Sequence, residues 1–247
     1  MGRGLQLEVT EVGASVGLKE GGETVPGSVQ EIRNGAAIWQ RFEQALCTVK
    51  AVMSYSEFLS AIITGDNTGR LMQYDPTTQK TQILLSNLSF PNGIALSSDG
   101  SFLLIAESTN CRILRYWLQN SSFEVFFQLP GFPDNIRRSP RGGFWVALHS
   151  RRSTLEKWLL SLPWIKKAFF YGSNLFPSSS INGVILFSKR MTNKGAMAMR
   201  LDEDGKIIEV LENPGERKMV FISEVHEMND SLWIGSVLMP FLWRYKI

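Results

Sequence analysis

The feature that most constrains this chain is a recurring series of short apolar runs separated by turn-forming residues. Residues 92–129 contain the runs NGIALS, FLLIAES, RILRYWL and EVFFQL, with SDGS, TN and QNSS near the breaks. Four such strands in one stretch are the content of one β-propeller blade. The series begins again at Asn135, 43 residues after Asn92, and each asparagine closely follows a Phe-Pro pair. A repeat of this length indicates successive blades.

The blade count from the sequence is incomplete. The runs GRLMQYD and KTQILLS supply half a blade, two full blades follow, and FISEVHE, LWIGSVL and FLWRYKI supply three strands of a last blade. We therefore predict an all-β fold, an incomplete propeller of about three to four blades. Open blades leave strand edges unpaired, which favours aggregation, and the last blade normally receives its fourth strand from an N-terminal segment.

Two segments depart from the blade pattern. Residues 1–55 are Gly-rich and polar, so we expect a divergent N-terminal segment, poorly ordered over its first 35 residues, with a helix near Ile38–Met53. Residues 56–247 form the propeller part. Within it, residues 153–195 read as an insertion with a helical pattern, of the kind that caps one face of a propeller.

Composition excludes several classes of function. The formal net charge of the 247 residues is only +3, and the densest basic stretch is broken by a turn and an apolar strand. We interpret its arginines as solvated loop ends, with contact to phosphate or an anionic surface as the alternative, and we expect no nucleic-acid partner. The arginines concerned are Arg137, Arg138, Arg141, Arg151 and Arg152.

Other sequence signals are weak. Cys47 and Cys111 lack the spacing of a zinc site or a disulfide framework, which leaves the redox compartment open. No signal peptide is visible, and the apolar stretch at residues 158–171 contains a proline and two lysines, which argues against a transmembrane span. Aromatic residues at alternating strand positions are expected to lie in the core between blades. They are Phe144, Trp145, Trp233, Phe241 and Trp243.

Three blocks of sequence carry a resemblance to a known family. They are GDNTGRLMQYDPTTQKTQILLSNLSFPNGIALSSDGSFLLIAES, LPGFPDNIRRSPRGGFWVALHS and SEVHEMNDSLWIGSVLMP. In this order they resemble the strictosidine synthase-like family, which is related to adipocyte plasma membrane-associated protein and to paraoxonase-type propellers. The resemblance covers about residues 56–247 and implies a six-bladed β-propeller. The family's first blades have no counterpart here, so we expect an N-terminally truncated form.

The resemblance also implies a candidate metal site. In metal-dependent relatives a calcium ion lies in the central channel, bound by acidic and asparagine side chains of the inner strands. The matching positions here are Asn92, Asn135 and Asp134. Side-chain oxygens of this kind suit a hard cation. The alternative is turn chemistry, because Asn and Gly readily adopt positive φ. We expect the calcium site to be incomplete, since the first acidic ligand would come from the absent blades.

Three further residues bear on catalysis. His149 is a candidate base that activates water at the channel mouth, although a structural role is the more common one for such a histidine. Strictosidine synthase uses a glutamate as general acid and base in condensing tryptamine with secologanin. Alignment on the strand ending in Ile234-Gly235 places Ser223 at that glutamate, with Glu224, a second catalytic candidate, one residue further. A shift of one residue turns a strand side chain to the opposite face, which argues against this condensation.

The family resemblance favours a metal-dependent hydrolase of esters or lactones that acts on a small molecule. The alternative from another class is a catalytically inert propeller fragment that binds a ligand or partner. Relatives are commonly found in the endomembrane system or the vacuole, or are secreted, which is our expectation for location. The oligomeric state is left open.

Overall fold

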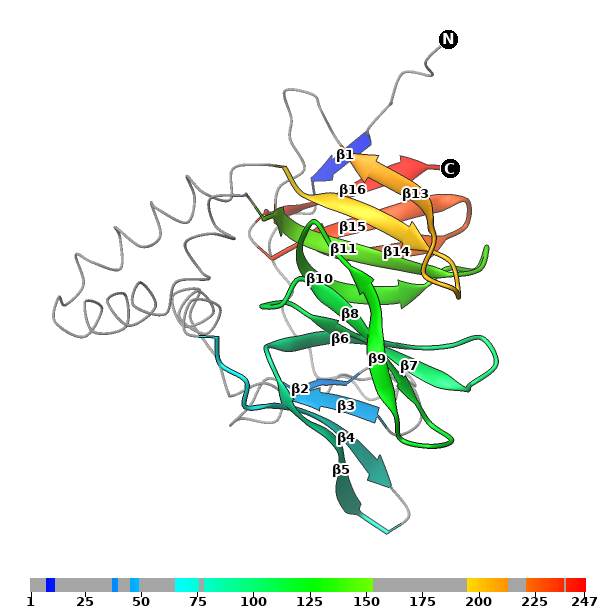
Figure 1. The fold of residues 1–247 in the computed structure, drawn as a ribbon. Coiled ribbons are helices and arrows are strands. Elements are labelled where there is room, and N and C mark those ends of the chain that lie inside the picture. The colour runs from blue at the N-terminus through cyan, green and yellow to red at the C-terminus, as the bar shows by residue number, and fades with distance from the viewer. Residues whose placement is uncertain are drawn as a thin grey trace, which may run out of the picture.

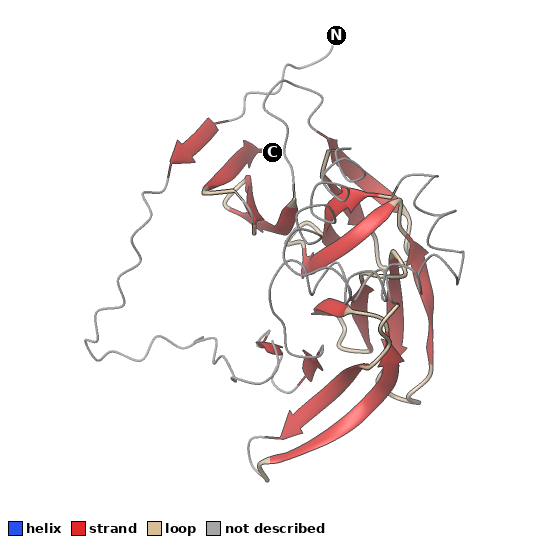
Figure 2. Cartoon of the chain, turned by 90° about the vertical axis from the view of Figure 1, so that its left-hand side faces the viewer, coloured by secondary structure: helices blue, strands red, loops and turns tan. Residues whose placement is uncertain are grey.

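The structure is a computed structural model, and it describes residues 8–11, 37–39, 45–48, 65–75, 78–152, 195–212, 221–237 and 239–247. Its strands form four antiparallel sheets of four strands each, stacked side by side along an arc (Figure 1). Every regular element in these ranges is a strand, as Figure 2 shows. This is the predicted all-β fold, with each sheet as one blade. None of these elements is a helix of the length and apolarity that a bilayer crossing needs.

The first and second blades lie at one end of the arc. The first consists, in spatial order, of β2 (Ala37–Trp39), β3 (Ala45–Thr48), β4 (Gly69–Asp75) and β5 (Lys80–Leu88). The second consists of β6 (Pro91–Leu96), β7 (Phe102–Glu107), β8 (Arg112–Trp117) and β9 (Phe123–Gln128).

The third and fourth blades complete the arc. The third consists of β10 (Gly131–Arg138), β11 (Phe144–Arg151), β12 (Met197–Leu201) and β13 (Ile207–Glu212). The fourth consists of β14 (Ile222–Met228), β15 (Ser231–Ser236), β16 (Phe241–Lys246) and β1 (Glu8–Glu11). The strands β6, β10 and β14 begin these blades, and β10 lies beside both β6 and β14.

The N-terminal segment supplies strands that the sequence pattern did not indicate. β1 pairs with β16, with Val9 opposite Trp243, and so provides the expected fourth strand of the last blade. β3 pairs with β4, with Cys47 opposite Leu71, and completes the first blade together with β2. The helix expected over Ile38–Met53 is therefore wrong. The free edge of β4 binds this segment as strands, which overrides its weak helical pattern. The helical insertion predicted at residues 153–195 lies almost wholly outside the described residues.

Apolar clusters fill the three junctions between neighbouring blades. Leu71 and Leu88 of the first blade pack against Ile94 and Ile105 of the second. The next cluster joins β6 to β9 with β10 to β12, and a third joins the third and fourth blades. Complete burial of one such large side chain contributes roughly 1.5–3 kcal/mol. The predicted core aromatics Phe144, Trp145 and Trp243 are buried, which confirms that part of the prediction.

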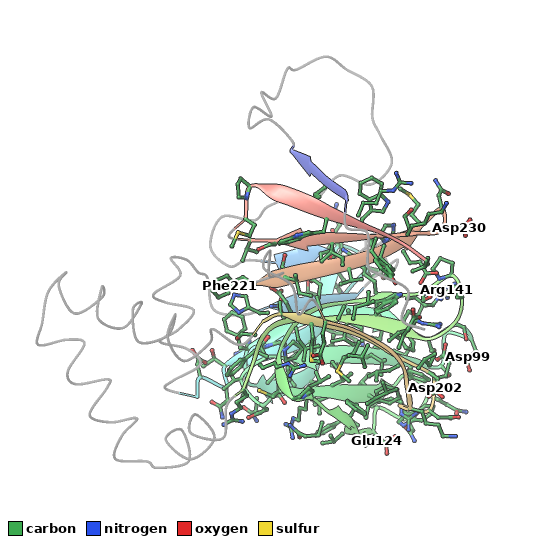
Figure 3. All side chains as sticks on the ribbon, turned by 90° about the horizontal axis from the view of Figure 1, so that it is seen from above. Asp99, Glu124, Arg141, Asp202, Phe221 and Asp230 are labelled. Carbon is green, nitrogen blue, oxygen red and sulfur yellow. The ribbon has the colours of Figure 1, made fainter. Side chains whose placement is uncertain are left out.

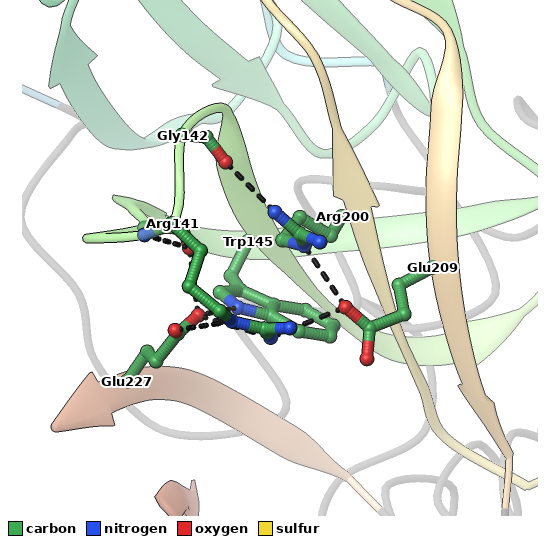
Figure 4. A network of polar contacts seen from close by, with 7 residues as sticks. Arg141, Gly142, Trp145, Arg200, Glu209 and Glu227 are labelled. Atoms are coloured by element: carbon green, nitrogen blue, oxygen red, sulfur yellow. Dashed lines mark hydrogen bonds and ion pairs between the residues drawn. The ribbon is translucent and has the colours of Figure 1, made fainter. Parts of the chain in front are cut away.

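A buried carboxylate joins the third blade to the fourth at one end of the sheets (Figure 4). Glu227 of β14 accepts hydrogen bonds from Trp145 Nε1 at 2.7 Å, Ser139 Oγ at 2.6 Å and Arg141 Nε at 2.6 Å. Burial alone would raise the pKa of Glu227, but the hydrogen bonds from Arg141, Ser139 and Trp145 outweigh it and lower that pKa. The negative charge therefore holds three donors of the neighbouring blade in place.

The same network extends into the outer strands of the third blade. Arg141 Nη2 and Arg200 Nε both donate to Glu209 Oε2, at 3.2 and 3.0 Å, and Arg200 Nη1 donates to the Gly142 carbonyl at 3.0 Å (Figure 4). Arg151 is paired with Glu212. Arg141 and Arg151 of the predicted basic stretch are therefore paired with carboxylates while their side chains stay 40% and 36% exposed.

The two ends of the sheets differ in character. Figure 3 places Asp99, Arg141, Asp202 and Asp230, which belong to tight turns, on one side of the molecule, and Phe221 on the opposite side. Phe221 directly precedes β14. The strands β6, β10 and β14 begin at the Phe221 end, where β7, β11 and β15 finish.

Candidate functional site

Two neighbouring innermost strands carry a β-bulge at equivalent places. In β6 the register passes from Pro91 opposite Glu107 to Ile94 opposite Ile105, so Asn92 and Gly93 together oppose one residue. In β10 it passes from Pro133 opposite Leu148 to Ile136 opposite Val146, so Asp134 and Asn135 do the same. A bulge redirects side chains out of the regular alternation. The three predicted metal ligands therefore lie on two bulges in adjacent blades.

The fourth blade has a matching irregularity. In β14 the register passes from Ile222 opposite Ser236 to Glu224 opposite Gly235, which leaves Ser223 as an extra residue. Phe221, just before this strand, and Phe90, just before β6, both have a φ of 54°. Positive φ is strained for a bulky residue, and such strain is concentrated at functional sites. The starts of the inner strands are thus irregular in three consecutive blades.

The first two bulges are in direct contact. A Cβ placed on Gly93 would lie 2.6 Å from the Ile136 backbone nitrogen and 2.7 Å from the Asn135 Cα. Only glycine permits this approach of β6 to β10. It brings Asn92 next to the Asp134-Asn135 pair.

The carboxyl of Asp134 is the electrostatic centre of the site. The pKa of Asp134 is raised to about 7, first by burial and then by the nearby charge of Glu224, while a hydrogen bond from the Asn92 side chain partly opposes the shift. Asn92, Asp134 and Glu224 therefore converge from three blades. The ionised form of Asp134 needs a positive partner at neutral pH.

The side-chain oxygen of Asn135 is a further candidate ligand for a cation. Its Oδ1 is buried and has no hydrogen-bond partner among the described residues. A buried amide oxygen without a partner costs about 1–3 kcal/mol, so its presence calls for a ligand, an ion or water. With the Asp134 carboxylate and the Asn92 amide it forms a donor set of oxygens, which suits a hard divalent cation such as Ca²⁺. No group of three or more His, Cys, Asp or Glu side chains suited to a metal occurs in the described ranges.

Glu224 is held by an arginine from the neighbouring blade. Arg137 of β10 donates from Nε to Glu224 Oε1 at 2.9 Å and from Nη2 to Oε2 at 3.0 Å. Both carboxylate oxygens are thus engaged, which hinders their use as a free acid or base. Ser223, the residue aligned with the strictosidine synthase glutamate, is buried. The bulge explains the offset, since the carboxylate beside Asp134 comes from the residue after Ser223.

His149 is on β11, the second strand of its blade. It lies between Leu148, which is opposite Pro133, and Ser150, which is opposite Phe132. Its ring packs against Phe221 with centroids 4.9 Å apart, and burial lowers the pKa of His149 to about 4. The imidazole is therefore neutral at physiological pH. Its Nδ1 lies 3.5 Å from Ser150 Oγ.

Comparison with known proteins identifies the family. The sequence family described as strictosidine synthase matches residues 48–121. Protein STRICTOSIDINE SYNTHASE-LIKE 2 of Arabidopsis thaliana is 45% identical over 80% of this chain and 53% of its own length. The chain belongs to the strictosidine synthase-like family. Adipocyte plasma membrane-associated protein of Homo sapiens is 33% identical over 77% of this chain and 45% of its own length. The strictosidine synthase-like chain thus spans about half the length of the curated relatives it matches.

A solved structure supports the fold. The luciferin-regenerating enzyme superposes on 87% of this strictosidine synthase-like chain and 62% of its own chain, with a TM-score of 0.53 and 14% sequence identity. The arc of four blades accordingly corresponds to part of a larger propeller.

The strictosidine synthase-like chain brings four of its five predicted site residues together. Asn92, Asp134 and Asn135 lie on the adjoining bulges of β6 and β10, Glu224 approaches them from β14, and His149 is on β11. Sequence reasoning missed Arg137 as the partner of Glu224. Only its place two residues after Asn135 on the same strand could have drawn attention to it.

Proposed function

We propose that this chain provides the cation-binding part of a propeller that hydrolyses esters or lactones of small molecules. The observation that carries the proposal is the buried Asn135 Oδ1, which lacks a hydrogen-bond partner in the described structure and lies on the bulge that also bears Asp134. Asn92, Asp134 and Asn135 would hold the cation, and Ca²⁺ suits these oxygen ligands best. When bound, the cation would polarise the carbonyl under attack and activate water.

The residues of the site have distinct roles in this proposal. Asp134 supplies the negative charge that the cation needs, and the hydrogen bond from Asn92 orients its carboxyl. Arg137 holds Glu224 in place by two hydrogen bonds, one to each carboxylate oxygen. His149 is neutral, so its ring can accept a proton, and a pKa of about 4 makes it a weak base at pH 7.

The test is turnover of aryl esters and lactones by the full chain, with and without added calcium. Calcium-dependent turnover that is lost in Asp134→Asn, Asn92→Ala and Asn135→Ala is the expected result. Asp230→Asn is the matched control, because Asp230 is exposed and lies at the opposite end of the sheets (Figure 3). Turnover that persists in Asp134→Asn would refute the assignment.

An inert binding propeller is the second candidate. It is favoured by the engagement of both Glu224 oxygens with Arg137, which hinders the use of this carboxylate as an acid or base. Absence of turnover together with absence of calcium-dependent stabilisation would establish it. Strictosidine condensation has less support, since Ser223 stands at the glutamate position. A small-molecule ligand and a location in the endomembrane system, the vacuole or outside the cell complete the proposal.

A further inference from the structure

Two more buried polar atoms lie at the same end of the sheets as the candidate cation site. They are Thr109 Oγ1 and Arg152 Nε, and neither has a hydrogen-bond partner in the part of the chain that the structure describes. Thr109 follows β7, whose last residue Glu107 lies opposite Pro91 at the start of β6. Arg152 follows β11, whose last residue Arg151 lies opposite Gly131 at the start of β10. Both residues therefore flank the bulges that carry Asn92 and Asn135.

Hydrogen bonds attach the two segments that carry these residues to the chain around the start of β10. The hydroxyl of Ser108, next to Thr109, donates to the Pro133 carbonyl. The backbone nitrogen of Arg152 donates to the Pro130 carbonyl at 2.9 Å. Pro133 directly precedes the bulge that carries Asp134 and Asn135, and Pro130 directly precedes β10. Both segments therefore meet the chain at the start of β10, next to the candidate cation site.

Arg152 differs from the other arginines at this end. Arg112 is paired with Glu107, Arg137 with Glu224 and Arg151 with Glu212. Arg152 has no such ion pair among the described residues, and its Nε–H is removed from water. A guanidinium N–H buried in this way needs an acceptor, and a carboxylate is the strongest one available.

The net charge of the site also favours an anionic ligand, an argument that rests on the proposed function. The Arg137–Glu224 pair is neutral, so a divalent cation on the Asp134 carboxylate leaves one positive charge, to which Arg152 adds another. A mouth with excess positive charge attracts anions. Ester and lactone hydrolysis both release a carboxylate, so an anion-binding subsite fits that chemistry.

We propose that Arg152 and Thr109 form a subsite that binds a carboxylate group of the ligand. Arg152 Nε donates one charged hydrogen bond to it, and the Thr109 hydroxyl donates a second. The subsite makes the protein select acidic ligands over neutral ones of the same shape. The subsite lies beside the cation site, and it would bind a carboxylate even in a protein that hydrolyses no ester.

The experiment compares butyrate with its neutral isostere butyramide, titrated into the full chain with calcium present and followed by NMR. The wild-type chain should bind butyrate at least tenfold more tightly than butyramide. Arg152→Gln should abolish this preference, and Thr109→Val should weaken butyrate binding severalfold. Arg152→Lys keeps the charge but lacks the Nε–H donor, so the preference should be reduced and still present. Arg138→Gln, an exposed position on β10, is the control and should change nothing.

The outcomes separate the subsite from the hydrolase proposal. Loss of the preference in Arg152→Gln, in a chain that shows no ester turnover, supports the subsite and removes the hydrolase. Unchanged butyrate binding in both Arg152→Gln and Thr109→Val means that buried water satisfies the two atoms, and it overturns the subsite whether or not esters are hydrolysed. Should Arg152→Gln fail to fold, Arg152→Lys with Thr109→Val decides, since unaltered binding in both gives the same refutation.

Discussion

Gly93 and Asn135 are in backbone contact across the junction of the second and third blades. A Cβ on Gly93 would fall 2.7 Å from the Asn135 Cα and 3.0 Å from its carbonyl carbon, well inside the van der Waals limit. These are backbone atoms of a strand bonded on its other side to β11, so they cannot shift cheaply. The glycine therefore sets the distance between the two bulges that carry the candidate cation ligands.

Gly93→Ala should consequently destabilise the fold and move the bulges of β6 and β10 apart. Overpacking of this kind costs about 1–3 kcal/mol, and denaturant unfolding measures it. The increase in stability that added calcium produces should also be smaller in Gly93→Ala than in the wild-type chain. Gly235→Ala is the control, since a Cβ there meets its nearest atoms at 3.6 and 3.7 Å, an ordinary contact. Equal losses in the two variants would contradict the prediction.

The Glu227 network should make a measurable contribution to the docking of the fourth blade. Glu227→Gln keeps the shape of the side chain but removes the charge that three donors share, so we expect a loss of about 2–3 kcal/mol in the free energy of unfolding. The Glu124–Arg115 pair is the matched control, because the Glu124 side chain is half exposed. Glu124→Gln should cost much less, and a loss as large as that of Glu227→Gln would show that burial is irrelevant here.

The blade pattern was predictable from the sequence because apolar alternation and turn residues encode it locally. The repeat that relates Asn92 to Asn135 correctly placed both on equivalent inner strands. Strands β1, β2 and β3 were not predictable in this way. They are short, and pairing with β16 and β4 rather than their own composition defines them as strands. A strand recruited by an edge carries little local signal.

In the candidate site too, some residues could be predicted from the sequence and others depend on contacts between distant strands. Asn92, Asp134 and Asn135 were predicted as candidates from the family resemblance, whereas the Arg137–Glu224 pair joins residues far apart in sequence, and only the packing of β10 against β14 brings them together. The one-residue offset between Ser223 and Glu224 could not be resolved either. A bulge changes which face a side chain takes, and the sequence pattern of β14 does not reveal it.

His149 makes stability depend on pH in a defined direction. Burial lowers its pKa from 6.5 to about 4, so the unfolded chain takes up a proton more readily than the folded chain between these values. Stability from this group is complete above pH 6.5 and is lost as the pH falls toward 4. The loss approaches about 1.4 kcal/mol per pH unit and totals about 3 kcal/mol.

Two variants isolate this contribution from that of the carboxyl groups. Unfolding of the wild-type chain and of His149→Gln should be compared across the range from pH 7 to pH 4, where the variant should lose less stability. His226→Gln is the control, because His226 is exposed. Parallel curves for the wild-type chain and His149→Gln would show that His149 is not held neutral by burial.

Substitutions of Asn135 test whether this side chain lowers the stability of the fold in order to bind a cation. Its Oδ1 is buried without a partner in the described structure, so Asn135→Leu should raise the free energy of unfolding by about 1 kcal/mol when calcium is absent. The same variant should lose the stabilisation that calcium gives the wild-type chain. Asn135→Asp should do the reverse, because a second carboxylate beside Asp134 repels it without calcium and binds calcium more tightly. Chemical unfolding with calcium and with chelator measures both effects. A calcium-free Asn135→Leu chain less stable than wild type would mean that the Asn135 side chain serves packing rather than a cation.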